Sequence, residues 1–272
     1  MSQHHDITGR VTTRSLRQMK AQGEKIASLT AYDAAFARVL DEAGMDFILV
    51  GDSLGMVVQG LQTTIPVTMD EMVYHTKLVS RGIKRAMLMA DMPFMSYASG
   101  EDCLRNAARL MKEGGAEIVK LEWGELEIDM VARLTECGIP VCAHLGLTPQ
   151  AVHKFGGFRV QGREETAARK MKEDALALEQ AGADLLLLEC VPMALAAEIT
   201  AASGVPVIGI GAGPEVDGQI LVLYDILDIA PGKRTRFSKN YMVGADSIHV
   251  AIANYVNEVK TRKFPTAEYG FS

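Results

Sequence analysis

Cysteine, aromatic residues and positive charge are all scarce in this chain of 272 residues. Four cysteines occur, and no two of them have the Cys-x-x-Cys spacing of many zinc and redox sites. The first 25 residues are mostly polar, unlike a secretory signal. We therefore expect reduced thiols in a cytoplasmic protein. The thiols are those of Cys103, Cys137, Cys142 and Cys190.

A basic surface and a membrane span are also missing. The formal net charge of −6 argues against nucleic-acid partners, because their binding needs an excess of positive charge. The richest apolar tract, residues 185–202, contains Glu189, Pro192 and Glu198 and is therefore a poor membrane span. These properties leave open a small anionic substrate held by a lysine and a metal ion.

Short apolar runs that end in a polar or charged residue recur along the chain. Phe47–Val50 is typical of a strand buried on both faces, and Gly51, Asp52 and Ser53 follow it. Later runs end in the same way, at Asp91, Glu122, His144 and Glu189. In a parallel α/β barrel such strand ends meet on the catalytic face. Capping of the next helix explains one such residue but hardly all of them.

Eight strand-like runs alternate with helical patterns, which predicts a single-domain (β/α)8 TIM barrel over residues 1–272. A doubly wound sheet is the alternative, but it needs fewer strands and a reversal of strand order. The eighth strand is the least clear, because residues 219–227 could continue a helix. The predicted strands cover residues 25–30, 47–50, 86–90, 117–121, 141–143, 184–188, 205–210 and 220–224.

The two ends of the chain are expected to lie outside this alternation. Residues 1–10 look loose and polar. Residues 13–22 predict an N-terminal helix that closes the bottom of the barrel, with Gly23 as its stop. Residues 231–272 are expected to form a C-terminal loop and helical extension, with the helix over residues 244–262.

Three of the strand-end carboxylates predict a site for a hard divalent cation. Asp52, Asp91 and Glu122 follow successive strands, and all-oxygen ligation at that face suits Mg²⁺. A 2-oxo acid would fill open metal positions with a carboxylate oxygen and its ketone oxygen. The metal then acts as a Lewis acid, stabilising the enolate that forms when the adjacent carbon loses a proton.

Three further side chains complete the candidate site. Lys120 lies two residues before Glu122, so both point to one face of the strand, where the lysine could neutralise an oxyanion. A structural ion pair and a Schiff base are alternatives, although nearby acids keep the lysine protonated and disfavour the latter. Glu189 is the candidate general base, since burial raises its pKa. His144 is either the second-ranked base or a structural residue.

A glycine-rich segment, residues 209–213, follows the seventh strand. Barrels often hold phosphate at this position. The glycines could equally let the backbone approach a flat ligand closely. The pattern alone does not decide between the two.

Seven motifs together resemble those of the ketopantoate hydroxymethyltransferase family. They span residues 12–245 in the order that the family has. The motifs are Leu29–Asp33, Val50–Gly55, Ala90–Phe94, Val119–Glu122, His144–Gln150, Val160–Arg163 and Ile208–Gly213. The resemblance implies an Mg²⁺-dependent barrel of the phosphoenolpyruvate/pyruvate superfamily. It also implies transfer of a one-carbon unit from 5,10-methylenetetrahydrofolate to 3-methyl-2-oxobutanoate, giving 2-dehydropantoate and tetrahydrofolate for pantothenate synthesis.

The resemblance further implies residue roles and an assembly. Asp52 and Asp91 match metal ligands, and Glu122 matches a third, acting through water. Glu189 matches the proton acceptor. The oxo-acid contacts match Asp52, Ser53, Asp91 and Lys120. Members of the family are typically homo-oligomers, often decamers, so we expect a homo-oligomer.

Two alternatives to this function and one further hypothesis remain. The chain could be another Mg²⁺-dependent 2-oxo-acid enolate enzyme of the superfamily, such as a lyase or mutase, or a non-catalytic barrel. The Lys-Lys-Cys-Gly-His signature of isocitrate lyase is absent. The basic segment at residues 233–239 is either a solvated loop or, on the catalytic face, a contact for the anionic glutamate tail of folate.

Overall fold

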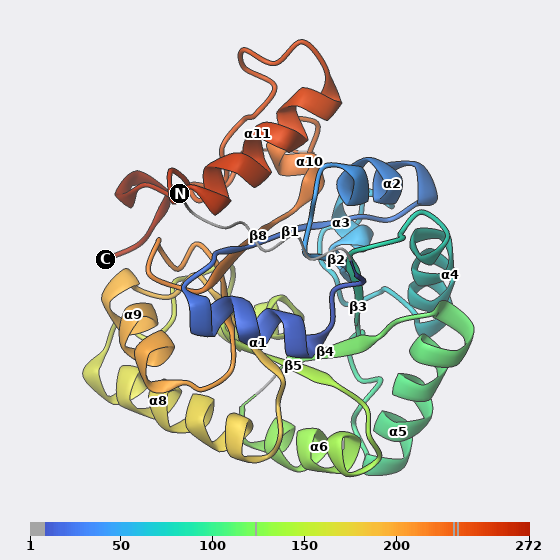
Figure 1. Cartoon of the computed structure of the whole chain (residues 1–272). Helices are drawn as coiled ribbons and strands as arrows, with labels where there is room; N and C mark the ends of the chain where they lie inside the picture. Colours follow the sequence, from blue (N-terminus) through green and yellow to red (C-terminus); the bar gives the residue numbers. More distant parts are fainter. Residues whose placement is uncertain (1–8, 123, 231, 233) are drawn as a thin grey trace.

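The computed structural model describes residues 9–122, 124–230, 232 and 234–272 (Figure 1). Eight parallel strands close into a barrel in sequence order, and the eighth strand pairs with the first. The predicted (β/α)8 barrel is confirmed, and the doubly wound alternative is wrong. The strands are β1 (Ile26–Thr30), β2 (Phe47–Val50), β3 (Met87–Asp91), β4 (Ile118–Glu122), β5 (Val141–Gly146), β6 (Leu185–Glu189), β7 (Val207–Ile210) and β8 (Gly218–Leu221).

The continuous apolar character of the strands follows from their place in the barrel. Every residue of β2, β3 and β4 is buried, because the barrel interior covers one face and the helices cover the other. The helices that follow strands form the outer ring. They are α2 (Ala34–Glu42), α4 (Met69–Ser80), α5 (Gly100–Arg109), α6 (Gly124–Glu136), α8 (Glu165–Gln180), α9 (Met193–Ala202) and α10 (Leu223–Ile226). The short helix α3 (Leu54–Val57) instead lies at the carboxyl end of the barrel.

Helix boundaries follow the local capping signals. The Thr68 hydroxyl accepts a hydrogen bond from the Glu71 backbone N–H, and the Glu71 carboxylate accepts one from the Thr68 N–H, so the predicted capping box starts α4. The Asp33 carboxylate caps α2 by accepting hydrogen bonds from the backbone N–H groups of Ala35 and Phe36. A five-residue π-helix (Leu110–Gly114) extends α5. None of the helices described has the length and apolar content needed to span a bilayer, and all four cysteines are free thiols.

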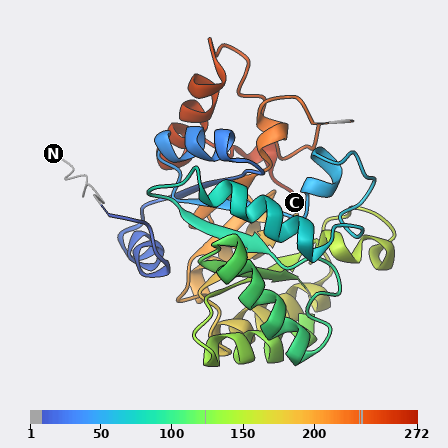
Figure 2. The ribbon, with the colours of Figure 1, turned by 90° about the vertical axis from the view of Figure 1, so that its right-hand side faces the viewer.

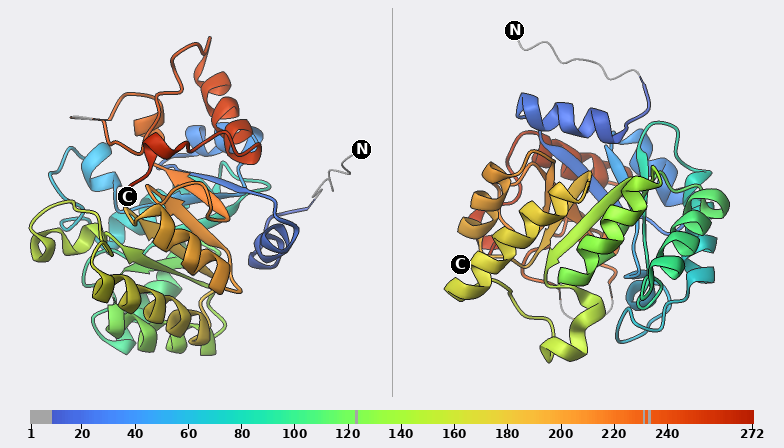
Figure 3. Two further views of the ribbon diagram at one scale, coloured as in Figure 1. Left: turned by 90° about the vertical axis from the view of Figure 1, so that its left-hand side faces the viewer. Right: turned by 90° about the horizontal axis from the view of Figure 1, so that it is seen from below.

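Helix α1 (Thr13–Gln22) crosses the amino-terminal end of the barrel, as predicted (Figure 1). Arg17 forms an ion pair of 3.0 Å with Asp184, the residue before β6. Lys20 Nζ lies 2.7 Å from a carboxylate oxygen of Asp217, the residue before β8. Figures 2 and 3 show α1 on the side of the barrel opposite α3. These ion pairs hold α1 across the amino-terminal end of the barrel, so that the carboxyl-terminal end is left for the site.

Strands β5 and β8 differ most from their predicted bounds, by three residues at one end, whereas the other strands differ by two residues or fewer. Strand β8 begins at Gly218 and ends at Leu221, before the short helix α10, because Gly218 pairs closely with Ile26 of β1. A Cβ on Gly218 would lie 2.7 Å from the Ile26 carbonyl oxygen, so only glycine suits this register. Strand β5 runs on to Gly146, which places His144 inside the strand rather than after it.

The long connections and the C-terminal region also contain more structure than predicted. The segment after β2 begins with α3, and the segment after β5 contains a 3₁₀ turn (Pro149–Ala151) and helix α7 (Val152–Phe155). The last helix, α11 (Ile248–Lys260), is shorter than predicted and packs on the outside of β1 and β8. Its Tyr255 hydroxyl lies 2.9 Å from the Ser28 carbonyl oxygen. The expectation of a loose start concerns residues 1–10, of which residues 1–8 lie outside the described part. Arg10 forms an ion pair of 2.8 Å with Glu117.

Candidate active site

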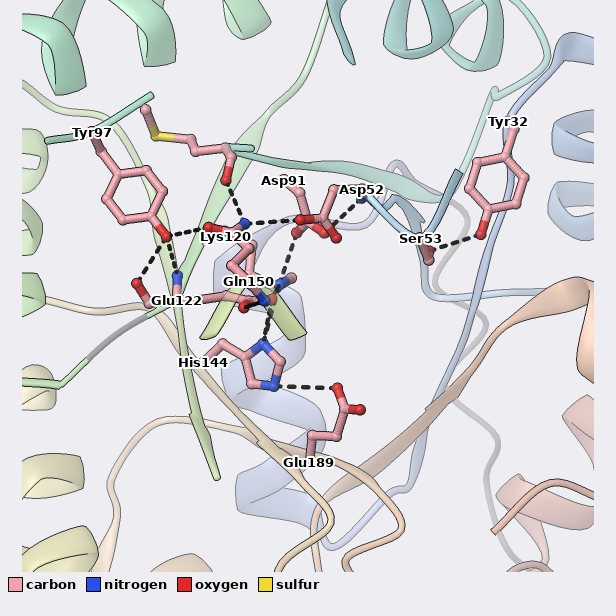
Figure 4. A network of polar contacts seen from close by, with 11 residues as sticks. Tyr32, Asp52, Ser53, Asp91, Tyr97, Lys120, Glu122, His144, Gln150 and Glu189 are labelled. Atoms are coloured by element: carbon pink, nitrogen blue, oxygen red, sulfur yellow. Dashed lines mark hydrogen bonds and ion pairs between the residues drawn. The ribbon is translucent and has the colours of Figure 1, made fainter. Parts of the chain in front are cut away.

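The predicted strand-end residues gather at the carboxyl end of the barrel. They line a cavity of about 790 Å³, and no residue of α1 is among its lining residues. The polar residues shared by the cavity and the prediction are Asp52, Ser53, Asp91, Lys120, Glu122, His144 and Glu189. The parallel barrel brings together residues that are up to 137 positions apart in sequence, which is the distance between Asp52 and Glu189. The structure thus assembles every predicted site residue in one place (Figure 4).

Lys120 is at the centre of this group. Its Nζ lies 3.0 Å from Asp91 Oδ1, 3.3 Å from Glu122 Oε1 and 3.2 Å from His144 Nδ1. Burial alone lowers the pKa of the Lys120 ammonium, but the charges of Asp91, Glu122 and Asp52 outweigh burial and raise that pKa well above its usual value. The lysine is therefore a permanent cation, which argues against a Schiff base.

Glu122 is the carboxylate that Lys120 and His144 hold ionised. Burial by itself raises the pKa of Glu122, but the Lys120 charge and the His144 contact bring it down to about 2. His144 Nδ1 lies 3.2 Å from Glu122 Oε1, and the Gln150 backbone N–H donates to Glu122 Oε2. Both carboxylate oxygens thus have partners within the protein. Because both of its oxygens already have partners, the Glu122 carboxylate suits an indirect role beside a metal ion.

Asp52 and Asp91 form a pair of closely spaced carboxylates. The Asp52 backbone N–H donates to Asp91 Oδ2 at 3.0 Å. Burial, and then the charges of Asp91 and Glu122, raises the pKa of Asp52 well above its usual value. Burial and the Glu122 charge raise the pKa of Asp91 to about 6, against the opposing effect of Lys120. With both carboxylates ionised, the group would carry more negative charge than Lys120 offsets, so the pair retains a proton more readily than exposed carboxylates do.

This donor set fits a hard divalent cation held by two carboxylates. A magnesium ion is commonly bound through one or two carboxylates, with water and substrate as its other ligands. Asp52 and Asp91 supply two carboxylates, and a dication beside them would offset the surplus negative charge. Among the residues described, no three His, Cys, Asp or Glu side chains converge as a ready metal site. Direct ligation by all three predicted acids therefore stays a prediction, whereas a contribution of Glu122 through water needs no such convergence.

Glu189 and His144 form the opposite side of the group. His144 Nε2 lies 3.5 Å from Glu189 Oε2. Burial, followed by repulsion from Glu122, raises the pKa of Glu189 well above its usual value. Burial and the Lys120 charge lower the pKa of His144, so the imidazole is neutral near pH 7. The His144 side chain is 2% exposed and that of Glu189 is 16% exposed, so Glu189 is the more accessible of the two candidate bases.

Gln150 is a site residue that the sequence analysis did not single out. Its side-chain Nε2 donates to Asp52 Oδ2 at 2.9 Å and to the Met92 carbonyl oxygen at 3.0 Å (Figure 4). The Tyr97 hydroxyl donates to Gln150 Oε1 at 2.6 Å. Because the Met92 carbonyl can only accept, the amide must present its NH₂ group to Asp52. The sequence signals for this role are its place at the end of the motif His144–Gln150 and its polarity in the long connection after β5.

Tyr32 is a second residue that the sequence analysis missed. Its hydroxyl lies 2.9 Å from the Ser53 hydroxyl oxygen, and burial raises the pKa of Tyr32 above its usual value. Tyr32 follows β1 and Ser53 follows β2, so the contact joins neighbouring strand ends. It fixes the hydroxyl of Ser53, which the resemblance assigned to oxo-acid binding.

The basic segment borders the mouth of the cavity. Arg234 and Arg236 line the cavity, and each already has a partner in the chain. Arg234 forms an ion pair with Asp228, and the Arg236 guanidinium lies 5.5 Å from the centre of the Phe271 ring. Lys239 instead contacts Glu258, and Lys233 lies outside the described residues. The predicted position on the catalytic face is confirmed for Arg234 and Arg236.

The glycine-rich segment after β7 contacts aromatic rings of the chain itself. Gly211 has φ of +64°, and a Cβ there would lie 3.0 Å from the Phe237 ring and 3.1 Å from the Phe271 ring. Gly213 has φ of +85° and packs in the same way against Met193. These glycines thus allow close packing beside the cavity.

Comparison with known sequences agrees with this geometry. Residues 10–267 match the protein-family model described as ketopantoate hydroxymethyltransferase. The chain is 61% identical to 3-methyl-2-oxobutanoate hydroxymethyltransferase of Alkalilimnicola ehrlichii, over 96% of this chain and 94% of that protein. It is 57% identical to the enzyme of the same name from Nitrosococcus oceani, over 97% of this chain and all (100%) of that protein.

Solved structures share the fold at low sequence identity. A phosphoenolpyruvate phosphomutase from Streptomyces platensis has a TM-score of 0.61 at 14% identity, covering 79% of this chain and 82% of that one. Phosphonopyruvate hydrolase, solved in complex with oxalate and Mg²⁺, has a TM-score of 0.59 at 15% identity, covering 78% and 80%.

Proposed function

Because the chain belongs to the ketopantoate hydroxymethyltransferase family, we propose that its barrel cavity deprotonates 3-methyl-2-oxobutanoate and adds a one-carbon unit to the resulting enolate. Transfer of a hydroxymethyl group to this oxo acid is the activity of its relatives, and the chain is a transferase of pantothenate synthesis. A lyase, a mutase and a non-catalytic barrel are therefore disfavoured. The roles of individual residues below are our proposal.

Asp52 and Asp91 would hold Mg²⁺, with Glu122 supporting the ion through water. When bound, Mg²⁺ supplies Lewis-acid stabilisation of the negative charge that develops on the ketone oxygen of the substrate. Two observations support this assignment: the surplus of buried carboxylate charge at Asp52 and Asp91, and the oxalate and Mg²⁺ bound by phosphonopyruvate hydrolase, which shares the fold. Oxalate resembles the carboxylate and ketone oxygens of a 2-oxo acid.

Ser53 and Lys120 would bind the oxo acid. The Tyr32 hydroxyl orients Ser53, and the permanent positive charge of Lys120 lies where negative charge builds up during deprotonation. Since Lys120 is already bound between Asp91 and Glu122, its position changes little during the reaction. The lysine thus lowers the energy of the charged enolate more than that of the neutral ketone.

Glu189 would remove the proton from the carbon next to the ketone. Its raised pKa makes it a stronger base than an exposed glutamate, and its carboxylate borders the cavity. The neutral ring of His144 contacts Glu189 at 3.5 Å, and the His144 side chain is 2% exposed against 16% for Glu189. Geometry therefore ranks Glu189 above His144 as the base.

The donor of the one-carbon unit would be 5,10-methylenetetrahydrofolate. The methylene carbon would lose both of its C–N bonds, one as it bonds to the enolate carbon and one as it bonds to a water oxygen. The proton removed from the oxo acid and one proton of that water would end on the two folate nitrogens, so that tetrahydrofolate leaves. The cavity extends from the carboxylates to Arg234 and Arg236 at its mouth and has space for a second, larger substrate. These arginines would attract the anionic glutamate tail of the folate, with modest energy because the rim is wet.

The single observation that carries the proposal is the position of Glu189 beside a buried carboxylate–lysine group. Its test is deuterium exchange into 3-methyl-2-oxobutanoate in D₂O, with and without Mg²⁺ and without folate. We expect Mg²⁺-dependent exchange by the wild type, loss of oxo-acid binding in Asp52→Ala, and retained binding but at least about 100-fold slower exchange in Glu189→Gln. Exchange by Glu189→Gln at the wild-type rate would refute the assignment of the base.

We also propose that the enzyme is a homo-oligomer. Three apolar residues of the C-terminal region are exposed in the single chain, namely Val243, Ile248 and Val250. Exposed apolar side chains that cluster in one segment are typical of protein interfaces. A monomer in light scattering at micromolar concentration would contradict this proposal.

A further inference from the structure

We propose that the last residues of the chain build the wall on which the pterin ring of the folate stacks, with Phe271 as its central residue. This inference rests on the proposed folate co-substrate. It adds a binding residue 82 positions beyond Glu189, at the C-terminal end of the chain.

The C-terminal tail is anchored against the catalytic end of the barrel. The Met193 backbone N–H donates to the Phe271 carbonyl oxygen at 2.9 Å, which ties the tail to the start of α9. Gly270 lies so close to Met193 that a Cβ there would come within 2.4 Å of its sulfur atom. In Figures 2 and 3 the C-terminus lies away from α1, toward the end of the barrel that carries α3. The C-terminal tail, through Phe271, thus forms part of the cavity wall.

Phe271 belongs to an aromatic and cationic group at the cavity wall. Its ring meets that of Phe237 edge to face, with 6.4 Å between the ring centres and 70° between the ring planes. Both rings are half-buried, line the cavity and pack against Gly211 at the end of β7. The Arg236 guanidinium lies 5.5 Å from the Phe271 ring centre, within the range of a cation–π contact.

Such a wall suits a flat, partly polar ring system. A ligand ring can stack on phenylalanine, while a guanidinium beside it meets carbonyl or carboxylate oxygens. The branched oxo acid is small and would lie at the carboxylates in the base of the cavity, so it leaves the wall free. The pterin of the folate has a flat pyrimidine ring fused to a reduced ring, and it must lie in the same cavity, because its attached methylene carbon reacts with the enolate. Phe271 therefore acts on the folate and not on the oxo acid.

The test compares two leucine variants of the same tail. Phe271→Leu keeps an apolar side chain at the wall but removes the ring. Tyr269→Leu removes a ring that packs on Phe264, 5.3 Å between ring centres, and does not line the cavity. The probes are tetrahydrofolate, titrated calorimetrically, and 3-methyl-2-oxobutanoate with Mg²⁺. Phe271→Tyr serves as the conservative variant that restores the ring.

We expect Phe271→Leu to weaken tetrahydrofolate binding by about tenfold, the scale of one stacking contact, and to change oxo-acid binding far less. Phe271→Tyr should restore folate binding, and Tyr269→Leu should leave it unchanged. Wild-type folate affinity in Phe271→Leu would overturn the inference. Equal losses for folate and oxo acid, or equal losses in both leucine variants, would also overturn it by indicating a structural role. A wild type that exchanges deuterium but does not bind tetrahydrofolate would instead refute the proposed co-substrate.

Discussion

Substitution of Gln150 tests how neighbouring side chains orient the proposed metal ligand Asp52. The Gln150 side chain connects Asp52, the Met92 carbonyl and the Tyr97 hydroxyl, whereas its backbone N–H connects to Glu122. The substitution Gln150→Leu is close in volume and removes the three side-chain contacts while keeping the backbone one. It therefore frees Asp52 to rotate without changing any proposed ligand of the metal.

The expected loss of metal affinity follows from the hydrogen bond between Gln150 and Asp52 that the substitution removes. A hydrogen bond to a charged group contributes about 1.5–3 kcal/mol, which corresponds to a factor of about 10 to 150 in affinity. Loss of outer-sphere partners of metal ligands typically weakens metal binding by about 10- to 100-fold. Removing the Gln150 donor also favours the protonated form of Asp52, so protons compete better with the metal. We therefore expect Gln150→Leu to bind the metal about 10- to 100-fold more weakly, with a larger deficit at pH 6 than at pH 8.

The assay is Mn²⁺ binding measured by electron paramagnetic resonance of the free ion, which needs no catalytic turnover. Tyr97→Phe is the matched control, because it removes one partner of Gln150 while the Met92 carbonyl still orients the amide toward Asp52. We expect Tyr97→Phe to change Mn²⁺ affinity by less than about threefold, since no contact to Asp52 is lost. Wild-type Mn²⁺ affinity in folded Gln150→Leu at both pH values would refute the reasoning. Equal losses in the two variants would refute it as well.

Two further predictions concern charge. Because burial raises the folded-state pKa of Glu189, its ionisation destabilises the fold as pH rises through that pKa. Glu189→Gln should therefore raise the melting temperature of the metal-free protein more at pH 8 than at pH 5. An equal increase in melting temperature at both pH values, measured by calorimetry, would contradict this. Replacing Arg234 and Arg236 together by Ala should raise the KM for the folate, increasingly so with more glutamates on its tail, and spare the KM for the oxo acid. Steady-state kinetics with mono- and polyglutamylated folate test this, and identical behaviour of the two proteins would identify the segment as an ordinary loop.

Much of the site was predictable because strand periodicity and barrel topology are local and repetitive. Asp52, Asp91, Glu122 and Glu189 each end an apolar run, and parallel strands in a closed barrel bring such ends to one face. The pairing of Lys120 with Glu122 followed from the two-residue repeat of a strand. Motif resemblance added the reaction, which strand patterns do not specify.

The tertiary structure alone decided the contacts that loops and the chain end make. Gln150 reaches Asp52 across 98 residues of sequence, and Phe271 reaches Gly211 across 60 residues. No periodic pattern marks such residues, because their position depends on how two connections fold over the barrel and not on an element of their own. The limits of β8 differ from the prediction for a similar reason. Pairing with β1 and β7 sets them, and the pattern of residues 219–227 suits strand and helix equally. The sequence by itself therefore determined the barrel and its ring of acids, whereas only packing at long range decided which side chains orient those acids and which ones wall the cavity above them.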